Sequence, residues 1–125
     1  VYELHGSVHR NYCQHCGKFY DAQYMKSCHD VPRCTCGGII KPDVVLYEES
    51  LDEQCLMNSV QAIAQADMLI IGGTSLAVYP AAGLIQYFRG KYLVVINKGQ
   101  TQRSTGAQLT IDAPIGKVLE QIQVR

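Results

Sequence analysis

Two closely spaced pairs of cysteines constrain the fold of this 125-residue chain more than any other sequence feature. Two residues separate Cys13 from Cys16, one separates Cys34 from Cys36, and 17 residues lie between the pairs. Four thiolates presented by two turns can complete a tetrahedron around zinc, with Zn–S distances of about 2.3 Å. Such a site leaves no coordination position open, so the ion would be structural rather than catalytic.

The second pair is tighter than the usual two-residue spacing, so Cys28 or His29 is an alternative ligand if Cys36 cannot reach the metal. Unrelated buried thiols or disulfides are the other interpretation, but close pairs without a recognisable secretion signal favour metal. Turns with positive φ favour glycine, and glycines follow both pairs, at Gly17, Gly37 and Gly38. Residues 7–40 have few apolar runs, and a segment this short usually needs a metal or a disulfide to replace a core. We therefore expect residues 7–40 to form a zinc-binding module.

Composition excludes several other classes of protein. With 47% hydrophobic and 18% charged residues, the chain is not a disordered tail. The 11 basic and 11 acidic side chains cancel, which argues against a nucleic-acid binder or an acidic-membrane binder. No apolar stretch approaches the roughly 20 residues that cross a bilayer, and the first residues lack a signal-peptide pattern. We expect a cytoplasmic protein with no nucleic-acid or membrane partner.

From Val44 onward, short apolar runs alternate with amphipathic segments. Ser50 and Glu53 form a capping box ahead of a helix whose apolar positions continue to Ala66. Pro80 is placed to begin a further helix. The expected strands are 1–4, 44–47, 68–71, 92–96 and 109–111, and the expected helices are 51–66, 81–89 and 114–123. Strands that are apolar on both faces and alternate with helices predict an α/β, Rossmann-like doubly wound parallel sheet covered on both sides.

Polar residues follow three successive strands of this expected sheet. The segment Gly72–Ser75 suits a phosphate or ribose, because glycine lets the backbone approach a ligand and hydroxyls donate to phosphate oxygens. Asn97 and Asp112 follow the next two strands. Each of these segments is also explained as a plain turn. Their common edge in a parallel sheet nevertheless favours a single ligand-binding crevice.

His5 is the candidate catalytic residue. Imidazole is largely neutral yet basic near pH 7, which suits a general base, although a lone histidine is more often structural. Glu48 and Glu49 form a carboxylate pair, but the dipole of the following helix also explains acidic residues at that place. Cys55 has no basic neighbour on its expected helix, so a reactive thiolate is not expected there.

Together these segments resemble the sirtuins, a family of NAD-dependent protein lysine deacylases. The matching segments occur in family order and at family spacing: Glu3–Gly6, the two cysteine pairs, Ile40–Glu49, Gly72–Ala82 and Val95–Gly99. The short stretch between the cysteine pairs is most similar to the compact bacterial members. The resemblance implies the C-terminal part of a Rossmann-like NAD-binding domain, formed by residues 1–6 and 41–125, with the zinc-binding module of residues 7–40 inserted.

The resemblance also implies a reaction and a set of site residues. Nicotinamide would leave NAD as the acyl oxygen attacks the ribose, and His5 would deprotonate a ribose hydroxyl to yield deacylated lysine and O-acyl-ADP-ribose. The NAD ligands would be Gly73, Thr74, Ser75, Asn97, Lys98, Gly99, Asp112 and Ala113. The acylated-lysine protein or peptide would bind as an added strand, along Val45, Leu46, Tyr47, Glu48, Ala77, Val78 and Tyr79. One structural Zn²⁺ would be held by Cys13, Cys16, Cys34 and Cys36.

The chain departs from the family pattern in two respects. Glu48 stands where the substrate loop of the family usually has glycine, which affects the backbone angles that the loop can adopt. The N-terminal half of the family, with its glycine-rich NAD loop, is absent, and the chain opens on Val1 without an initiator Met. We therefore expect a fragment that is inactive without the missing half and that exposes a strand edge. The alternatives are a non-catalytic zinc-ribbon module and an NAD or ADP-ribose binder.

Overall fold

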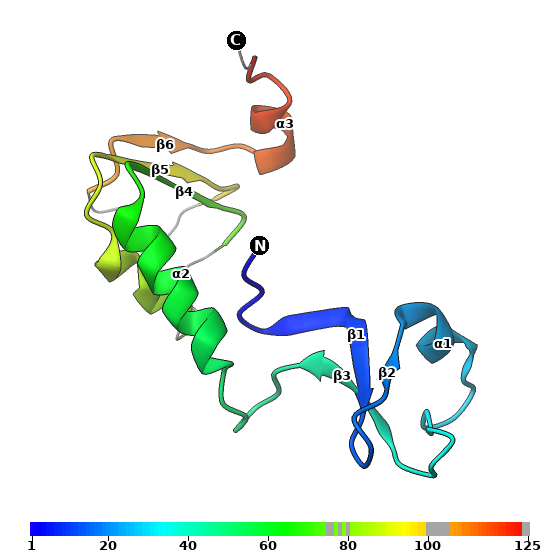
Figure 1. Cartoon of the computed structure of the whole chain (residues 1–125). Coiled ribbons are helices and arrows are strands. Elements are labelled where there is room, and N and C mark those ends of the chain that lie inside the picture. The colour runs from blue at the N-terminus through cyan, green and yellow to red at the C-terminus, as the bar shows by residue number, and fades with distance from the viewer. Residues whose placement is uncertain (75–76, 78, 80, 100–105, 124–125) are drawn as a thin grey trace. The chain divides into compact units, whose positions relative to one another are not determined.

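The structure is a computed structural model that describes residues 1–74, 77, 79, 81–99 and 106–123. The chain divides into two compact units, Val1–Leu56 and Met57–Arg125, whose strands and helices are shown in Figure 1. The first unit extends beyond residues 7–40 on both sides, and the expected domain boundaries stay a prediction. Among the described residues, no helix combines the length and the apolar character needed to cross a membrane.

The first unit is built on an antiparallel sheet in the order β2-β1-β3. Its strands are β1 (Gly6–Cys13), β2 (Phe19–Tyr20) and β3 (Ile40–Val44). The register of β1 against β3 shifts between Ser7 and Asn11, so β1 is bulged there. The buried Asn11 amide stabilises the bulge, because its Nδ2 donates to the carbonyls of Val8 and Tyr20.

A short helix, α1 (Ala22–Ser27), follows β2 in the first unit. Asp21 caps it, because Asp21 Oδ1 accepts a hydrogen bond from the Tyr24 N–H at 2.7 Å. The buried core of this unit is small: Cys13, Tyr20, Cys34 and Ile40, with Met25 packed against them. Two of these five side chains are thiols, so little apolar area is available to hold the sheet and α1 together.

Two strands expected in this unit are wrong or displaced. Residues 1–4 form no strand: the Gly6 N–H donates to the Glu3 carbonyl at 2.9 Å in a turn, and Val1 and Tyr2 are exposed. The strand expected over 44–47 instead covers Ile40–Val44 and includes a proline. Antiparallel pairing with β1 determines these bounds, and that long-range contact overrides the local apolar run.

The helix α2 (Glu53–Gln65) is confirmed, but its expected cap is wrong. Asp52, not Ser50, caps it: Asp52 Oδ1 accepts from the Cys55 N–H at 2.6 Å, and the Asp52 carbonyl accepts from Leu56. Aspartate is as good a cap as serine and lies directly before the first helical turn. The helix therefore begins two residues later than the capping box predicts.

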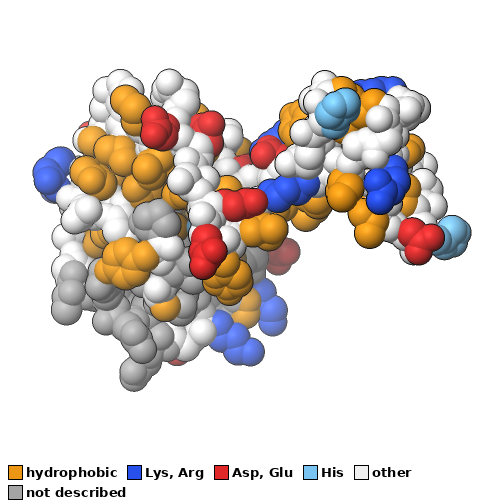
Figure 2. Space-filling view, turned by 90° about the horizontal axis from the view of Figure 1, so that it is seen from below, with side chains coloured by type: hydrophobic (Ala, Val, Ile, Leu, Met, Phe, Trp, Pro, Cys, Tyr) orange, Lys and Arg blue, Asp and Glu red, His pale blue; other side chains and the backbone are white. Residues whose placement is uncertain are grey.

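The second unit contains the expected parallel sheet, in the order β4-β5-β6. Its strands are β4 (Met68–Gly72), β5 (Tyr92–Ile96) and β6 (Leu109–Ile111), which confirms all three predicted runs. Ile71 and Val95 are buried at its centre, among Leu69, Ile85, Leu93 and Ala107. Met68 and Ile70 on β4 are about half exposed, and Figure 2 shows further apolar side chains at the surface of this unit. The described residues thus leave part of the sheet uncovered.

The remaining helices of the second unit are shorter than expected. Residues Ala81–Tyr87 form a 3₁₀ helix, η1, rather than an α-helix to residue 89, and Gly83, its third residue, has low α-helical propensity. Pro80, its expected first residue, lies outside the described residues. The last helix, α3, covers Ile115–Leu119 rather than 114–123 and follows Pro114, whose ring suits the start of a helix.

Candidate functional site

The four paired cysteines meet in the first unit. Their sulfur atoms all lie within 4.8 Å of one another. The Cys13 and Cys36 sulfurs are 3.5 Å apart, as are those of Cys16 and Cys34. Zn–S bonds of about 2.3 Å in a tetrahedron place sulfurs about 3.8 Å apart. Four thiols at this spacing fit zinc, as the sequence predicts.

Glycines shape the two turns that present these sulfurs. Gly17 (φ 72°) and Gly37 (φ 84°) have positive φ, and their N–H groups donate to the carbonyls of Cys13 and Cys34. Gly38 is not in this conformation, so that expectation is wrong for this residue. The lack of space explains the glycine at this position, because a Cβ at Gly38 would lie 2.7 Å from the Cys13 sulfur.

The alternative ligands do not join the cluster. Cys28 Sγ donates to the Tyr24 carbonyl at 3.4 Å, and His29 is exposed. The tight second pair is therefore sufficient, because Cys36 reaches the other sulfurs. The six cysteines are free thiols, which does not support the disulfide interpretation.

Hydrogen bonds and neighbouring sulfurs move the pKa values of Cys34 and Cys36 in opposite directions. The Cys36 N–H, followed by the Tyr20 hydroxyl, lowers the pKa of Cys34 to about 5. The Gly38 N–H lowers the pKa of Cys36, but the adjacent sulfurs, that of Cys34 first, outweigh it and raise this pKa to about 12. Four adjacent thiols cannot all ionise side by side, whereas a divalent cation at their centre would stabilise four thiolates.

His5 lies in the turn immediately before β1 and is exposed. Its backbone carbonyl accepts a hydrogen bond from the Val45 N–H at 3.1 Å, which ties the turn to the end of β3. Among the residues that the structure describes, its imidazole has no hydrogen-bond partner. Gly6 is required here, because its φ is 76° and a Cβ would collide with the Asp43 carbonyl.

An ion-pair network beside this turn was not anticipated from the sequence. Arg10 on β1 donates from Nε to Asp43 Oδ2 at 2.8 Å and from Nη1 to Glu3 Oε2. These two carboxylates, Glu3 first, raise the pKa of Arg10. All three side chains are about 40% exposed, so the network orients the segment before β1 more than it stabilises the fold. The pairing of β1 with β3 brings Arg10 to Asp43, and the turn before β1 brings Glu3 to Arg10.

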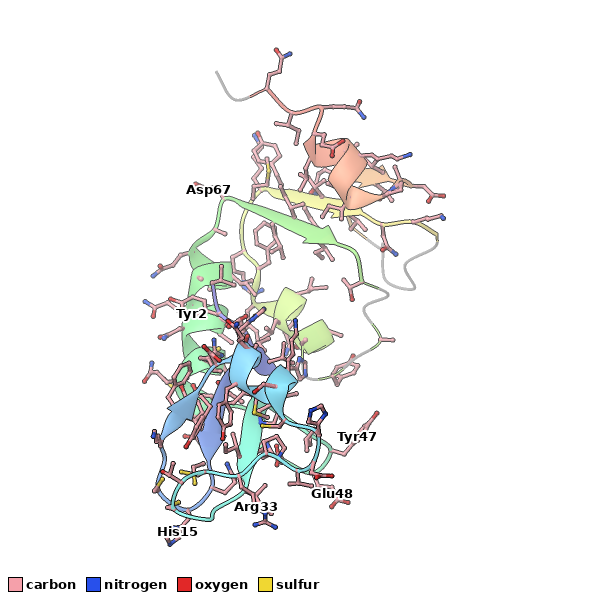
Figure 3. The ribbon with its side chains drawn as sticks, turned by 90° about the vertical axis from the view of Figure 1, so that its right-hand side faces the viewer. Tyr2, His15, Arg33, Tyr47, Glu48 and Asp67 are labelled. Atoms are coloured by element: carbon pink, nitrogen blue, oxygen red, sulfur yellow. The ribbon has the colours of Figure 1, made fainter. Side chains whose placement is uncertain are left out.

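The expected substrate segment leaves β3 and turns at residues 46–49. The Glu49 N–H donates to the Leu46 carbonyl at 3.2 Å, while the Glu49 carboxylate accepts from the Leu46 N–H and from Lys41 Nζ. Tyr47 is fully exposed, and Figure 3 shows it directed away from the ribbon. Glu48 has a φ of 68°, so it adopts the glycine-like conformation that its position requires.

The expected NAD ligands of the second unit lie at the carboxyl edge of its sheet. Parallel pairing places the ends of β4, β5 and β6 at one edge, and the Gly73 N–H donates to the Ile96 carbonyl there. The Gly99 N–H donates to Asp112 Oδ1 at 2.8 Å, which links the loops after β5 and β6. Lys98 is exposed, and Asn97, Ala113 and Thr74 are half-buried. The structure therefore brings these three strand ends together, as predicted.

The second expected substrate segment is described only in part. Ala77 and Tyr79 are exposed, whereas Val78, like the expected NAD ligand Ser75, lies outside the described residues. The cysteine cluster has a further neighbour that sequence reasoning missed, Tyr20, whose hydroxyl contacts Cys34. No motif signals that contact, because it depends on how β2 packs against the cysteine turns.

Known proteins resemble this chain in sequence and in fold. Residues 1–80 match the Sir2 family. The chain is similar to an NAD-dependent protein deacetylase of Clostridium acetobutylicum, with 60% identity over 98% of this chain and 51% of the relative. One of Cutibacterium acnes is 52% identical over 98% of this chain and 50% of that protein. A solved structure, "Sir2-p53 peptide-NAD+", is 32% identical with a TM-score of 0.82, covering 96% of this chain and 52% of the other. The chain thus spans about half the length of the curated relatives it matches.

Proposed function

The chain belongs to the Sir2 family, and on that premise we propose that it acts as part of an NAD-dependent protein lysine deacetylase. The observation that carries this proposal is 60% identity to a relative of that name over 98% of the chain. The reaction removes acyl groups such as acetyl from lysine side chains of proteins and yields nicotinamide and O-acyl-ADP-ribose. Because the chain spans about half of such relatives, we assign the activity to the whole protein and expect none from these residues alone.

His5 is the proposed catalytic base, which accepts a proton from a ribose hydroxyl of NAD. Three features of the first unit support this role. The imidazole is exposed, it has no partner among the described residues, and its backbone is held by the hydrogen bond from Val45. An imidazole without a fixed partner keeps a nitrogen lone pair available to accept a proton near pH 7.

The carboxyl edge of the β4-β5-β6 sheet is the proposed NAD-binding part of this chain. Ligands of parallel sheets bind outside the carboxyl ends of the strands, where loop N–H groups face them. NAD supplies the ribose carbon that receives the acyl oxygen and the nicotinamide that leaves. The residues proposed to bind it are Gly73, Thr74, Ser75, Asn97, Lys98, Gly99, Asp112 and Ala113.

The acylated-lysine peptide is proposed to bind along Val45–Glu48 and Ala77–Tyr79 through backbone hydrogen bonds, as an added strand. The 56% exposure of Leu46 and the complete exposure of Tyr47 support this assignment. We assign to Cys13, Cys16, Cys34 and Cys36 one zinc ion with a structural role, because four thiolates leave no coordination position for a substrate. We also propose a cytoplasmic location.

The test of this proposal is a histidine comparison in the whole protein. We expect nicotinamide release to require both NAD and an acetyl-lysine peptide, and His5→Ala to abolish it while the circular dichroism spectrum is unchanged. The matched control is His9→Ala, because His9 is an exposed histidine on β1 of the same unit. Equal activity of His5→Ala and the parent protein would remove His5 as the base. Absence of O-acetyl-ADP-ribose from the products of the parent protein would remove the proposed reaction.

A further inference from the structure

Tyr20 brings a hydroxyl group to the cysteine cluster. Its Oη donates to Cys34 Sγ at 3.1 Å, and the contact is buried. The Thr35 hydroxyl lies 3.9 Å from the same sulfur, which is a long contact. Tyr20 therefore supplies the short hydroxyl contact to a sulfur atom of the proposed zinc site, and this contact falls on the more tightly spaced cysteine pair.

The Tyr20 ring is held in place on several sides. It is 8% exposed, and its backbone carbonyl accepts a hydrogen bond from the buried Asn11 amide at 3.1 Å. The Tyr24 ring lies against it with centroids 4.6 Å apart, and Lys18 Nζ lies 5.5 Å from the ring centroid. The Thr35 N–H and hydroxyl also lie beside the Tyr20 oxygen, and the Cys34 sulfur is the acceptor of its own O–H, at 3.1 Å. The hydrogen bond is therefore built into the packing of β2 and α1.

A hydrogen bond to a metal-bound thiolate has two consequences. It orients the sulfur lone pairs. It also reduces the negative charge on the sulfur, which matters because four thiolates around one Zn²⁺ carry a net charge of minus two. The hydrogen bond acts on Cys34, which a single residue separates from Cys36. Groups of this kind around metal sites typically change metal affinity 10- to 100-fold when removed.

We propose that Tyr20 is a positioning residue for the zinc ion: its hydroxyl aims Cys34 at the metal and strengthens zinc retention. This inference rests on the zinc site of the proposed function. It assigns Tyr20 a role beyond filling the core, and that role depends on one oxygen atom. Removing the oxygen while keeping the ring therefore separates the two roles.

The first experiment measures the zinc affinity of the whole chain by competition with a chromophoric chelator. Tyr20→Phe keeps the ring and removes the donor, and we expect its zinc affinity to fall about 10- to 100-fold. Tyr24→Phe is the matched control, because the Tyr24 hydroxyl donates to the Arg33 carbonyl at 3.0 Å and not to sulfur. The control is expected to retain the affinity of the parent chain.

The second experiment replaces zinc with cobalt(II), whose absorption reports both geometry and the sulfur ligands. Loss of a hydrogen bond raises the energy of the sulfur lone pairs, so the sulfur-to-cobalt charge-transfer band of Tyr20→Phe should move to lower energy. The ligand-field bands should keep their tetrahedral pattern. Placing 4-aminophenylalanine at position 20 restores an N–H donor and should restore both the band and the affinity.

The outcomes distinguish the role of Tyr20 from the existence of the proposed zinc site. A parent chain that binds no zinc would refute the metal site itself. A parent chain that binds zinc, with Tyr20→Phe equal to it in affinity and band position, would refute the role of Tyr20 alone. If Tyr20→Phe and Tyr24→Phe lower the zinc affinity equally, or if 4-aminophenylalanine does not restore it, the role of Tyr20 is limited to packing in the core.

Discussion

Glu48 is the one non-glycine residue with positive φ in the described part of the chain, at 68°. The Glu49 N–H donates to the Leu46 carbonyl at 3.2 Å, so residues 46–49 form a hydrogen-bonded turn with Glu48 in its third position. A type II turn requires positive φ at this position and favours glycine. A left-handed conformation costs an L-residue roughly 1–2 kcal/mol. The turn of the proposed substrate segment is therefore strained at one residue.

We expect Glu48→Gly to stabilise the closed turn by about 0.5–1 kcal/mol. The relief of roughly 1–2 kcal/mol is partly offset by the greater backbone freedom of glycine in the open state, roughly 0.5–1 kcal/mol. Hydrogen exchange of the Glu49 amide measures this directly, because that N–H closes the turn. Its protection factor should rise about two- to fivefold.

The control for this prediction is Glu48→Ala, which removes the carboxylate but keeps the Cβ that causes the strain. Its Glu49 amide should exchange like that of the parent chain. Equal gains in the glycine and alanine variants would show that the charge of Glu48 opens the turn. A lower protection factor in Glu48→Gly would refute the strain itself.

Three further predictions concern the first unit. Chelation of zinc should remove hydrogen-exchange protection from β1 and β2 while β5 stays protected. The reason is that two of the five core residues of the first unit are thiols, so metal binding replaces part of the core. Protection of β1 in the metal-free chain would contradict this prediction. Gly38→Ala should weaken zinc binding in chelator competition, because its Cβ would lie 2.7 Å from the Cys13 sulfur, and an unchanged affinity would show that the turn relaxes. The Leu46 N–H, followed by Lys41, lowers the pKa of Glu49 below its ordinary 4.5. A carboxyl pKa that is lower in the folded state stabilises the fold above pH 4.5, and this contribution is lost as the pH falls through the folded-state pKa. Hydrogen-exchange protection of the Leu46 amide should therefore fall in that pH range. In Glu49→Gln the protection of this amide should be independent of pH.

The elements predicted correctly are those whose signal is local. The continuous apolar runs of β4 and β5 indicate buried strands by themselves and determine their bounds, whereas β6 is a weaker segment of three residues. The strands predicted at 1–4 and 44–47 failed because their partner decides them: β1 pairs with Ile40–Val44 and leaves the neighbouring apolar residues in turns. The cap predicted at Ser50 is wrong because Asp52 is also a good cap residue, and only the observed start of the helix distinguishes the two.

The proposed site likewise contains residues that the sequence predicts and contacts that only the structure reveals. Cysteine spacing predicted the four sulfurs that converge, and the order of strands predicted that Gly73, Asn97 and Asp112 share one edge of a sheet. No spacing predicted the Tyr20 hydroxyl on Cys34 or the Arg10 ion pairs with Glu3 and Asp43. Those contacts join residues between 7 and 33 positions apart across paired strands and packed turns.

The amino-acid sequence by itself determined which residues can ligate a metal and which segments form the parallel sheet, because both depend on side-chain chemistry and on intervals of a few residues. Only the tertiary structure decided where β1 and β3 pair and which hydroxyl reaches a sulfur. These depend on packing between segments distant in the chain, and packing selects among local conformations that differ by only about 1–2 kcal/mol.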